Sequence, residues 1–145
     1  YITSIFNGVK RVQDFGIEKI IFPAHPRVDK KIEEYKLDIP NNIIKIKPVG
    51  YLDMLLLLEN SKMIFTDSGG LQEEACILNI PCVTLRDNTE RPETVLVGAN
   101  ILTGCNEPKI LKAVKKMLKK EGGWSNPFGD GKSAARIINI IEKQL

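Results

Sequence analysis

The chain has 145 residues, 43% of them hydrophobic and 27% charged, a composition that indicates one globular domain with a core and argues against disorder. Its formal net charge of +3 is compatible with small anionic ligands and gives no reason to expect a nucleic-acid partner. No apolar run approaches the roughly 18 residues of a membrane-spanning helix and no signal peptide is visible, so we expect no membrane partner.

Helices and strands are predicted to alternate from the beginning of the chain. Apolar residues at helical spacing predict a first helix that ends near Gly16, and short apolar runs predict the strands. Leucines on all sides of the helix over 51–59 lead us to expect that it is well buried. The remaining predicted elements are strands over 19–22, 43–48, 63–66, 82–85 and 101–103, and helices over 26–35, 71–78, 93–97, 108–120 and about 133–144.

Short apolar strands that alternate with helices are typical of a doubly wound α/β domain, in which a Rossmann-like parallel sheet has helices on both faces. We place the whole chain, 1–145, in one such domain. Ligands of these sheets bind at the carboxyl ends of the strands. Polar or glycine-containing segments follow four predicted strands directly, at His25, 49–50, 68–70 and 86–91.

The three cysteines are odd in number and lack a Cys-X-X-Cys spacing. Because Cys76, Cys82 and Cys105 each lie among apolar residues, we expect buried free thiols and a reducing, cytoplasmic location. The chain begins at Tyr1 without a methionine, and its first residues already have helical spacing. We therefore expect a fragment whose N-terminal part is missing.

A glycine turn follows the strand over 63–66 and precedes a helix. Such a turn directs backbone N–H groups and the positive end of a helix dipole at one point, which suits a phosphate. Ser68, Gly69 and Gly70 are therefore candidate phosphate ligands, and the alternative is an ordinary tight turn. Glu74, one helical turn later, can accept hydrogen bonds from ribose hydroxyls, with a solvated helix glutamate as the alternative.

His25 is the single histidine and lies just past a strand, in a turn stiffened by Pro23 and Pro26. A histidine there can hydrogen-bond a diphosphate or protonate a leaving group near neutral pH, and the alternative is a structural turn residue.

The loop over 86–93 is dense in charge. Arg86 and Arg91 can bind phosphate through their guanidinium forks, although acidic side chains of the same loop are alternative partners. Thr89 is expected to cap the short helix that follows, and Glu73 is expected to be a solvated helix residue or an i,i+4 partner.

Taken together, these residues resemble the non-hydrolysing UDP-N-acetylglucosamine 2-epimerase family. The combination of Asp-Ser-Gly-Gly with Thr-Glu-Arg-Pro-Glu is highly specific to that family. The resemblance runs nearly the whole length of the chain in order, through Pro-Ala-His-Pro at 23–26, Pro-Val-Gly-Tyr at 48–51, Thr-Asp-Ser-Gly-Gly-Leu-Gln-Glu-Glu-Ala at 66–75, Pro-Cys-Val-Thr-Leu-Arg at 81–86, Asn-Thr-Glu-Arg-Pro-Glu-Thr at 88–94, Gly-Ala-Asn at 98–100 and Asn-Pro-Phe-Gly-Asp-Gly at 126–131.

The resemblance implies a GT-B architecture of two Rossmann-like domains, of which this chain is the C-terminal, nucleotide-binding half. The missing N-terminal domain would then be a partner across the cleft, and we expect the full-length protein to be a homodimer. The site residues implied for UDP or UDP-N-acetylglucosamine are His25 for the diphosphate and its departure, Ser68, Gly69 and Gly70 for phosphate, Glu74 for ribose, Arg91 for the diphosphate or sugar, and the segment around Met54 for uracil, where the family often has an aromatic residue.

The family's reaction interconverts UDP-N-acetylglucosamine and UDP-N-acetylmannosamine by elimination of UDP and re-addition, and requires no metal or redox cofactor. The carboxylates that move the C2 proton belong to the N-terminal domain, so the resemblance implies that this fragment alone is inactive. We expect a role in polysaccharide biosynthesis. The alternatives are a GT-B glycosyltransferase domain, a non-catalytic UDP-binding module, and a Rossmann-like domain whose loops only fold.

Overall fold

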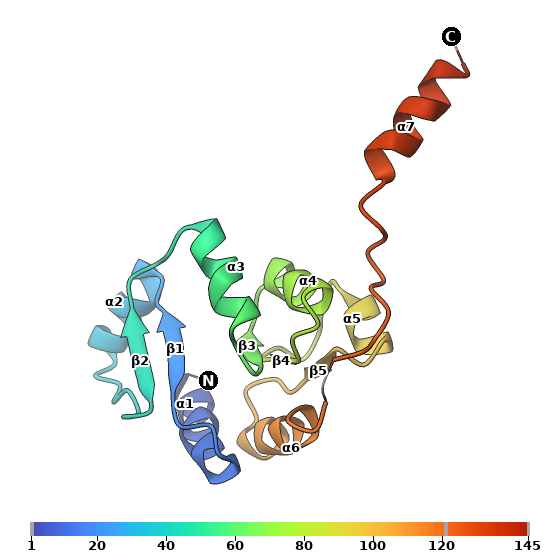
Figure 1. Cartoon of the computed structure of the whole chain (residues 1–145). Helices are drawn as coiled ribbons and strands as arrows, with labels where there is room; N and C mark the ends of the chain where they lie inside the picture. Colours follow the sequence, from blue (N-terminus) through green and yellow to red (C-terminus); the bar gives the residue numbers. More distant parts are fainter. Residues whose placement is uncertain (1, 121, 145) are drawn as a thin grey trace.

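The computed structural model describes residues 2–120 and 122–144; Tyr1 and Leu145, the ends of the predicted domain, lie outside this range, as does Glu121. Helices and strands alternate as predicted (Figure 1). The strands are β1 (Ile20–Pro23), β2 (Ile43–Ile46), β3 (Ile64–Thr66), β4 (Cys82–Thr84) and β5 (Asn100–Leu102), and the helices are α1 (Ile2–Lys10), the 3₁₀ helix η1 (Arg11–Phe15), α2 (Pro26–Glu34), α3 (Tyr51–Glu59), α4 (Gly69–Ile77), α5 (Pro92–Leu96), α6 (Glu107–Met117) and α7 (Ser133–Glu142).

All strand pairs are parallel, which confirms the predicted α/β class, but the strands form two sheets rather than one. β1 pairs with β2, with Ile20 opposite Ile43, and a separate sheet has the order β3-β4-β5. The reason for the difference is that an apolar run identifies a strand but carries no information about its hydrogen-bonding neighbour. That neighbour depends on where the packed helices hold each strand.

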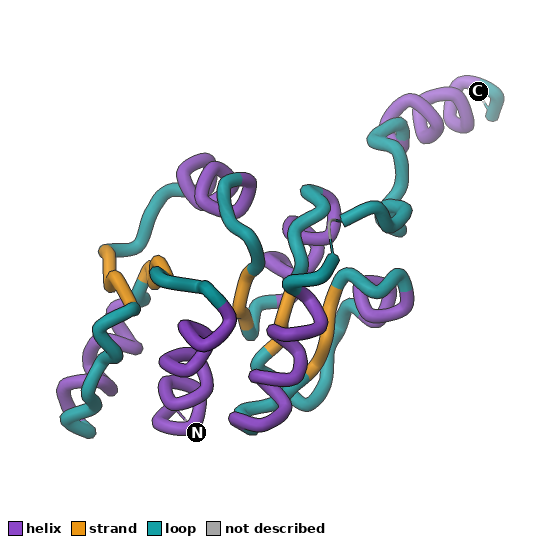
Figure 2. The backbone as a smooth tube through the Cα atoms, turned by 60° about the horizontal axis from the view of Figure 1, so that its bottom comes forward, coloured by secondary structure: helices purple, strands orange, loops and turns teal. Residues whose placement is uncertain are grey.

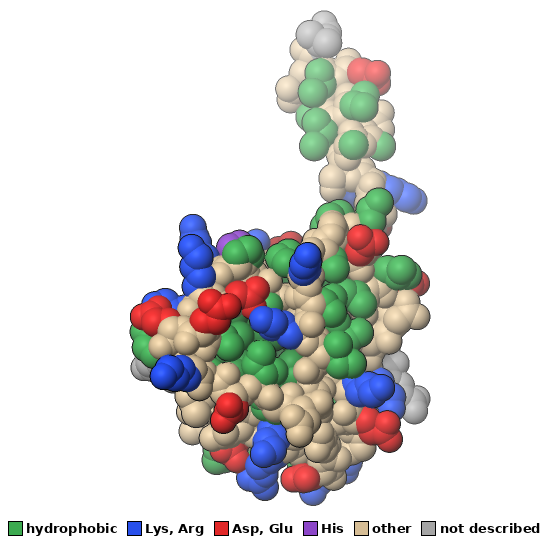
Figure 3. Space-filling model, turned by 90° about the vertical axis from the view of Figure 1, so that its left-hand side faces the viewer, with side chains coloured by type: hydrophobic (Ala, Val, Ile, Leu, Met, Phe, Trp, Pro, Cys, Tyr) green, Lys and Arg blue, Asp and Glu red, His purple; other side chains and the backbone are tan. Residues whose placement is uncertain are grey.

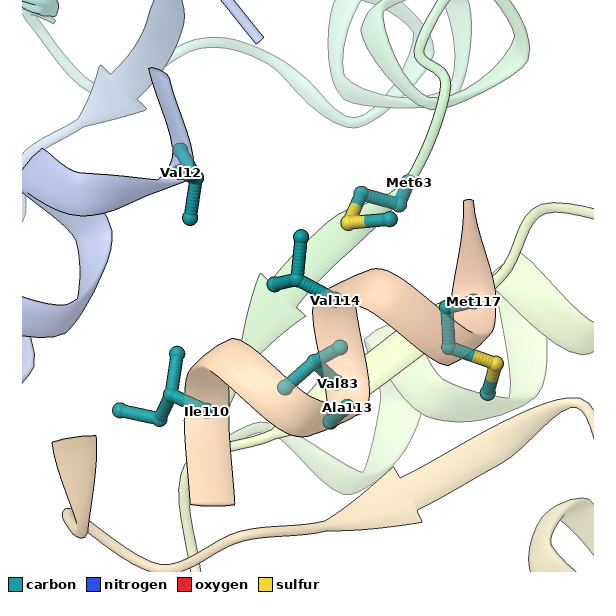
Figure 4. Packing of buried hydrophobic residues seen from close by; sticks show 7 residues of the cluster. All are labelled: Val12, Met63, Val83, Ile110, Ala113, Val114 and Met117. Atoms are coloured by element: carbon teal, nitrogen blue, oxygen red, sulfur yellow. The ribbon is translucent and has the colours of Figure 1, made fainter. Parts of the chain in front are cut away.

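Helices cover both faces of the three-stranded sheet, with α3 and α4 on one side and α6 on the other (Figures 1 and 2). Successive residues of a strand point to opposite faces, and β4 follows this rule. Cys82 packs with Leu58 of α3 and Ala75 of α4. Val83 lies in the opposite cluster, whose seven members are shown in Figure 4: Val12, Met63, Val83, Ile110, Ala113, Val114 and Met117.

The expectation that α3 is well buried is wrong. Leu58 is its buried residue, whereas Tyr51, Leu52 and Leu56 are 65%, 77% and 60% exposed. The helix contacts the rest of the chain on one side, where Leu55 and Leu58 meet the β3 and α4 residues. Leucines around a helix are therefore compatible with a helix that covers only one edge of a core.

The last helix, α7, projects away from the body of the molecule and is exposed along its whole length (Figure 1). Hydrophobic side chains are visible on this projecting segment in Figure 3. They include Ile137, Ile138, Ile140 and Ile141, which are between 51% and 57% exposed. Within the part of the chain that the structure describes, no helix has the length and apolar character needed to cross a membrane.

Truncating Ile110 is expected to destabilise the chain strongly, because this α6 side chain is fully buried in the cluster of Figure 4. Ile110→Ala should lower the free energy of unfolding by about 2–5 kcal/mol, measured by urea denaturation. Ile138→Ala is the matched control, since the same atoms are removed from a helix residue that is 56% exposed. Equal effects of the two substitutions would contradict the assignment of this core.

Candidate functional site

The turn between β3 and α4 carries three of the predicted site residues. Ser68 is the N-cap of α4, and its hydroxyl oxygen accepts a hydrogen bond from the Leu71 N–H at 3.5 Å. The Thr66 hydroxyl accepts from the Ser68 N–H at 3.0 Å, which holds the turn to the end of the strand. The hydroxyl hydrogen of Ser68 and the first N–H groups of α4 remain available to an anion at the positive end of the helix dipole.

Gly69 lets the arginine-containing loop lie directly against this turn. A Cβ at Gly69 would be 3.3 Å from Glu90 Oε2 and 4.0 Å from both Cγ and Cζ of Arg91. A Cβ there would therefore require the Glu90 carboxylate to shift by a few tenths of an ångström. The structure thus brings together two segments, 68–70 and 90–91, that the sequence analysis had placed only on the same edge of the sheet.

Both arginines of the loop have carboxylate partners. Arg86 forms an ion pair with Glu90, with 2.9 Å between Nη2 and Oε1, and this guanidinium lowers the pKa of the Glu90 carboxyl. Arg91 forms an ion pair with Glu73 of α4, so the expectation that Glu73 is merely solvated is wrong. Each arginine side chain is 35% exposed, so an anionic ligand can still reach it.

Glu74 lies on α4 beside Tyr51 of α3 and is half-buried. Burial raises the pKa of the Glu74 carboxyl, the charge of Glu73 adds to the rise, and the nearby Tyr51 hydroxyl partly offsets it. Met54 lies about one helical turn further along α3 and is also half-buried. The residues predicted to meet ribose and uracil therefore come from two neighbouring helices.

His25 lies at the end of β1, in the other sheet, and is exposed. It is the N-cap of α2, where its Nδ1 accepts a hydrogen bond from the Arg27 N–H at 3.2 Å. An accepting Nδ1 places the proton of a neutral imidazole on Nε2, so the outer nitrogen is a donor. The hydrogen bond from the Arg27 N–H gives His25 the structural turn role that was its alternative. Its Nε2 remains available to a ligand.

A group of buried polar side chains lies behind the turn, and the sequence analysis missed it. Gln72 and Asn100 are its amide members, and both are at most 2% exposed. One signal was present: Gln72 shares helical spacing with the buried Ala75 and Cys76, so it lies on the apolar side of α4. Thr89, which was expected to cap a helix, also belongs to this group.

Thr89 does not cap α5. That helix begins at Pro92, with Arg91 in the N-cap position and without a side-chain cap hydrogen bond. The Thr89 hydroxyl instead donates to Gln72 Oε1 at 2.5 Å and accepts from the Arg91 N–H at 2.9 Å.

Other possible centres lie elsewhere or have different chemistry. A hollow of about 600 Å³ is lined by α1 and by residues 36–42, a region that contains no predicted site residue. Across residues 2–120 and 122–144, no cluster of three or more His, Cys, Asp or Glu could hold a metal ion. Cys76 and Cys82 are buried free thiols as expected, whereas Cys105 is only half-buried. Burial raises the pKa of Cys82 to about 12, so it is protonated near neutral pH.

Comparisons of the chain with known proteins identify its family. The sequence model of the family described as UDP-N-acetylglucosamine 2-epimerase matches residues 1–142. The UDP-N-acetylglucosamine 2-epimerases of Methanocaldococcus jannaschii and Methanococcus maripaludis are 52% and 56% identical to the chain over 144 residues. Each alignment covers 97% of this chain and 39% or 38% of the relative.

Comparison with solved structures leads to the same family. The UDP-GlcNAc 2-epimerase of Methanocaldococcus jannaschii has a TM-score of 0.90 and 51% identity, with 98% of this chain and 41% of that chain covered. A second structure of that enzyme, in complex with UDP-GlcNAc and UDP, has a TM-score of 0.87 and covers 98% and 40% of the two chains. The chain thus spans about two fifths of the length of these relatives. Because the family match extends over residues 1–142, the chain belongs to the UDP-N-acetylglucosamine 2-epimerase family.

Proposed function

We propose that this chain is the UDP-binding, C-terminal half of a UDP-N-acetylglucosamine 2-epimerase. The whole enzyme would interconvert UDP-N-acetylglucosamine and UDP-N-acetylmannosamine by elimination of UDP and its re-addition. Family membership supports this reaction, and the M. jannaschii relative has been solved with UDP-GlcNAc and UDP. The catalytic groups that remove and return the C2 proton would lie on the N-terminal domain, outside this chain.

The observation that carries the proposal is the contact of the glycine turn with the arginine loop across Gly69. It joins two independent means of binding a diphosphate, namely the free N–H groups of a helix N-terminus and a guanidinium fork. Elimination places negative charge on the departing UDP. Donors that are already in position at that charge stabilise the transition state without reorganisation.

The ion pairs of the site are compatible with ligand exchange. On binding, a phosphate oxygen would replace the Glu73 carboxylate as the partner of Arg91. The Arg91 and Glu73 side chains are 35% and 34% exposed, so the pair is partly solvated, although the Arg91 Nε that faces Glu73 is itself buried. A diphosphate offers more acceptor oxygens than one carboxylate, so it can compete with Glu73.

The remaining predicted residues complete the nucleotide site in this proposal. Ionised Glu74 would accept hydrogen bonds from the ribose hydroxyls, and the α3 segment with Met54 would face the uracil. His25 would donate from Nε2 to the diphosphate and assist its departure, because Nδ1 is occupied by the Arg27 N–H.

The proposal extends to the setting of the protein. Residues 1–145 would form one nucleotide-binding domain that meets the missing N-terminal domain, and the full-length enzyme would be a homodimer without a metal or redox cofactor. The free thiols of Cys76, Cys82 and Cys105 favour a reducing compartment, the cytoplasm. A role in polysaccharide biosynthesis would follow from the product, an activated amino sugar.

The chain by itself is expected to bind UDP weakly and to leave UDP-N-acetylglucosamine unchanged. Calorimetry with UDP measures the first property, and proton NMR of the sugar nucleotide over time measures the second. A full-length UDP-N-acetylglucosamine 2-epimerase is the positive control for turnover. Appearance of the manno epimer or of 2-acetamidoglucal with this chain alone would contradict the assignment of proton transfer to another domain.

Arg91→Ala should weaken UDP binding by tenfold or more, because hydrogen bonds to charged groups contribute about 1.5–3 kcal/mol. Binding of uridine, which lacks phosphate, should change little. Arg136→Ala is the matched control, since Arg136 is also ion-paired with a carboxylate, that of Asp130, but lies on α7. If both variants bound UDP as the unmodified chain does, Arg91 would not be a phosphate ligand.

Glu74→Ala should abolish the preference of the chain for UDP over 2′-deoxy-UDP. The raised pKa of Glu74 adds a pH signature: the carboxylate is the accepting form, so affinity falls as the pH is lowered. The fall should begin at a higher pH than for an ordinary glutamate. UDP-N-acetylglucosamine suits this titration, because both its phosphates are esterified and its charge stays constant. A preference for the 2′-hydroxyl that survived in Glu74→Ala would refute the ribose assignment.

A further inference from the structure

Five polar side chains form one connected hydrogen-bond network behind the phosphate turn. They come from five separate segments, namely α4, β4, the loop after β4, α5 and β5. Four of them are at most 2% exposed and the Thr89 side chain is half-buried. The members are Gln72, Thr84, Thr89, Thr94 and Asn100.

The two amides are the centre of the network. Gln72 Oε1 accepts from the Thr89 hydroxyl at 2.5 Å and from Asn100 Nδ2 at 3.1 Å. Asn100 Nδ2 also donates to the Thr94 hydroxyl at 3.1 Å, and Asn100 Oδ1 accepts from the Thr84 hydroxyl at 2.8 Å. Helix α4, which begins at the phosphate turn, is thereby bonded to the central strand and to the edge strand of its sheet.

The backbone N–H and the backbone carbonyl of Arg91 both form hydrogen bonds with side chains of this network. The Arg91 N–H donates to the Thr89 hydroxyl at 2.9 Å, and the Arg91 carbonyl accepts from the Thr94 hydroxyl at 2.8 Å. The same two hydroxyls bond to Gln72 and Asn100. The backbone of Arg91 is therefore held from inside the domain, while its side chain reaches the surface of the site.

The burial of so many polar groups contributes little to the free energy of folding. Well-packed apolar side chains of similar volume are often as stable as a buried polar network, and Gln72 Nε2 has no hydrogen-bond partner among the described residues. The hydrogen bonds that the network does make nevertheless restrict its geometry, because each bond requires a particular direction. The network is accordingly better suited to fixing the position of the loop than to stabilising the core.

We infer that this network positions Arg91 for the diphosphate, with Gln72 and Thr89 as positioning residues. The inference rests on the proposed function and deepens it. Gln72 lies one helical turn from Ser68, and the Gln72 N–H bonds the Ser68 carbonyl at 3.2 Å. One helix thus fixes both the phosphate turn and, through Thr89, the backbone of Arg91. A site assembled before the ligand arrives loses less conformational entropy on binding.

Thr89 provides the sharpest test, because its side chain is half-buried whereas the other members are buried, so its substitution disturbs less packing. Thr89→Val removes the hydroxyl at constant shape, and Thr89→Ser keeps it. Thr89→Val should weaken UDP binding about tenfold, with uridine binding retained, and Thr89→Ser should bind UDP nearly as the unmodified chain does. Thr103→Val is the matched control, since it removes a buried hydroxyl that bonds the Thr84 and Gly104 carbonyls.

A double-mutant cycle connects the network to Arg91. If Thr89 acts through Arg91, Thr89→Val combined with Arg91→Ala should bind UDP no more weakly than Arg91→Ala alone. Gln72→Met, a second apolar replacement of similar length, should behave as Thr89→Val does. Urea denaturation of each variant separates a loss of folding from a loss of binding.

Two outcomes would overturn the inference, and they differ from failure of the proposed function. A purely structural network would show lowered stability in Thr89→Val with unchanged UDP affinity, or losses in the double variant that simply add. The proposed function would fail instead if the unmodified chain did not bind UDP, or if Arg91→Ala had no effect on UDP binding.

Discussion

The close approach of the Gly69 backbone to the loop that carries Glu90 and Arg91 is the constraint on which the site depends. A Cβ at this position would stand 3.3 Å from the Glu90 carboxylate, so the Glu90 side chain would have to shift by a few tenths of an ångström. Glycine at the first position of α4 therefore does more than relax a turn. It lets the N-terminal end of a helix dipole and a guanidinium fork act on the same point in space.

The charges around this point are balanced within the chain. Glu90 pairs with Arg86 and Glu73 pairs with Arg91, so the nearby carboxylates offset the repulsion between the two cations. The balance has consequences for Glu74, because burial and the neighbouring Glu73 charge both raise its pKa. A phosphate that took the place of Glu73 beside Arg91 would change the electrostatic surroundings of every ionisable group in the proposed nucleotide site.

The chain belongs to the UDP-N-acetylglucosamine 2-epimerase family and covers 39% of the M. jannaschii relative. In the proposed function it binds the leaving group, and the groups that move the proton lie on the rest of the protein. Two parts of its interior fit this proposal. The Gln72 and Asn100 amides face the loop of Arg91, whereas the apolar clusters hold the sheet between α4 and α6.

The sequence by itself determined the alternation of strands and helices, the α/β class and the family, because apolar periodicity and short motifs are local properties. It also placed Ser68, Gly69, Gly70 and Arg91 in segments that follow strand ends, and Glu74 one helical turn later. Only the tertiary structure decided that the strands form two sheets, that α3 is largely exposed, that Glu73 pairs with Arg91, and that Gln72 and Thr89 hold the loop. The physical reason is that these features depend on which surfaces meet. The partner of a buried amide or an exchangeable carboxylate lies many residues away, and no local pattern identifies it.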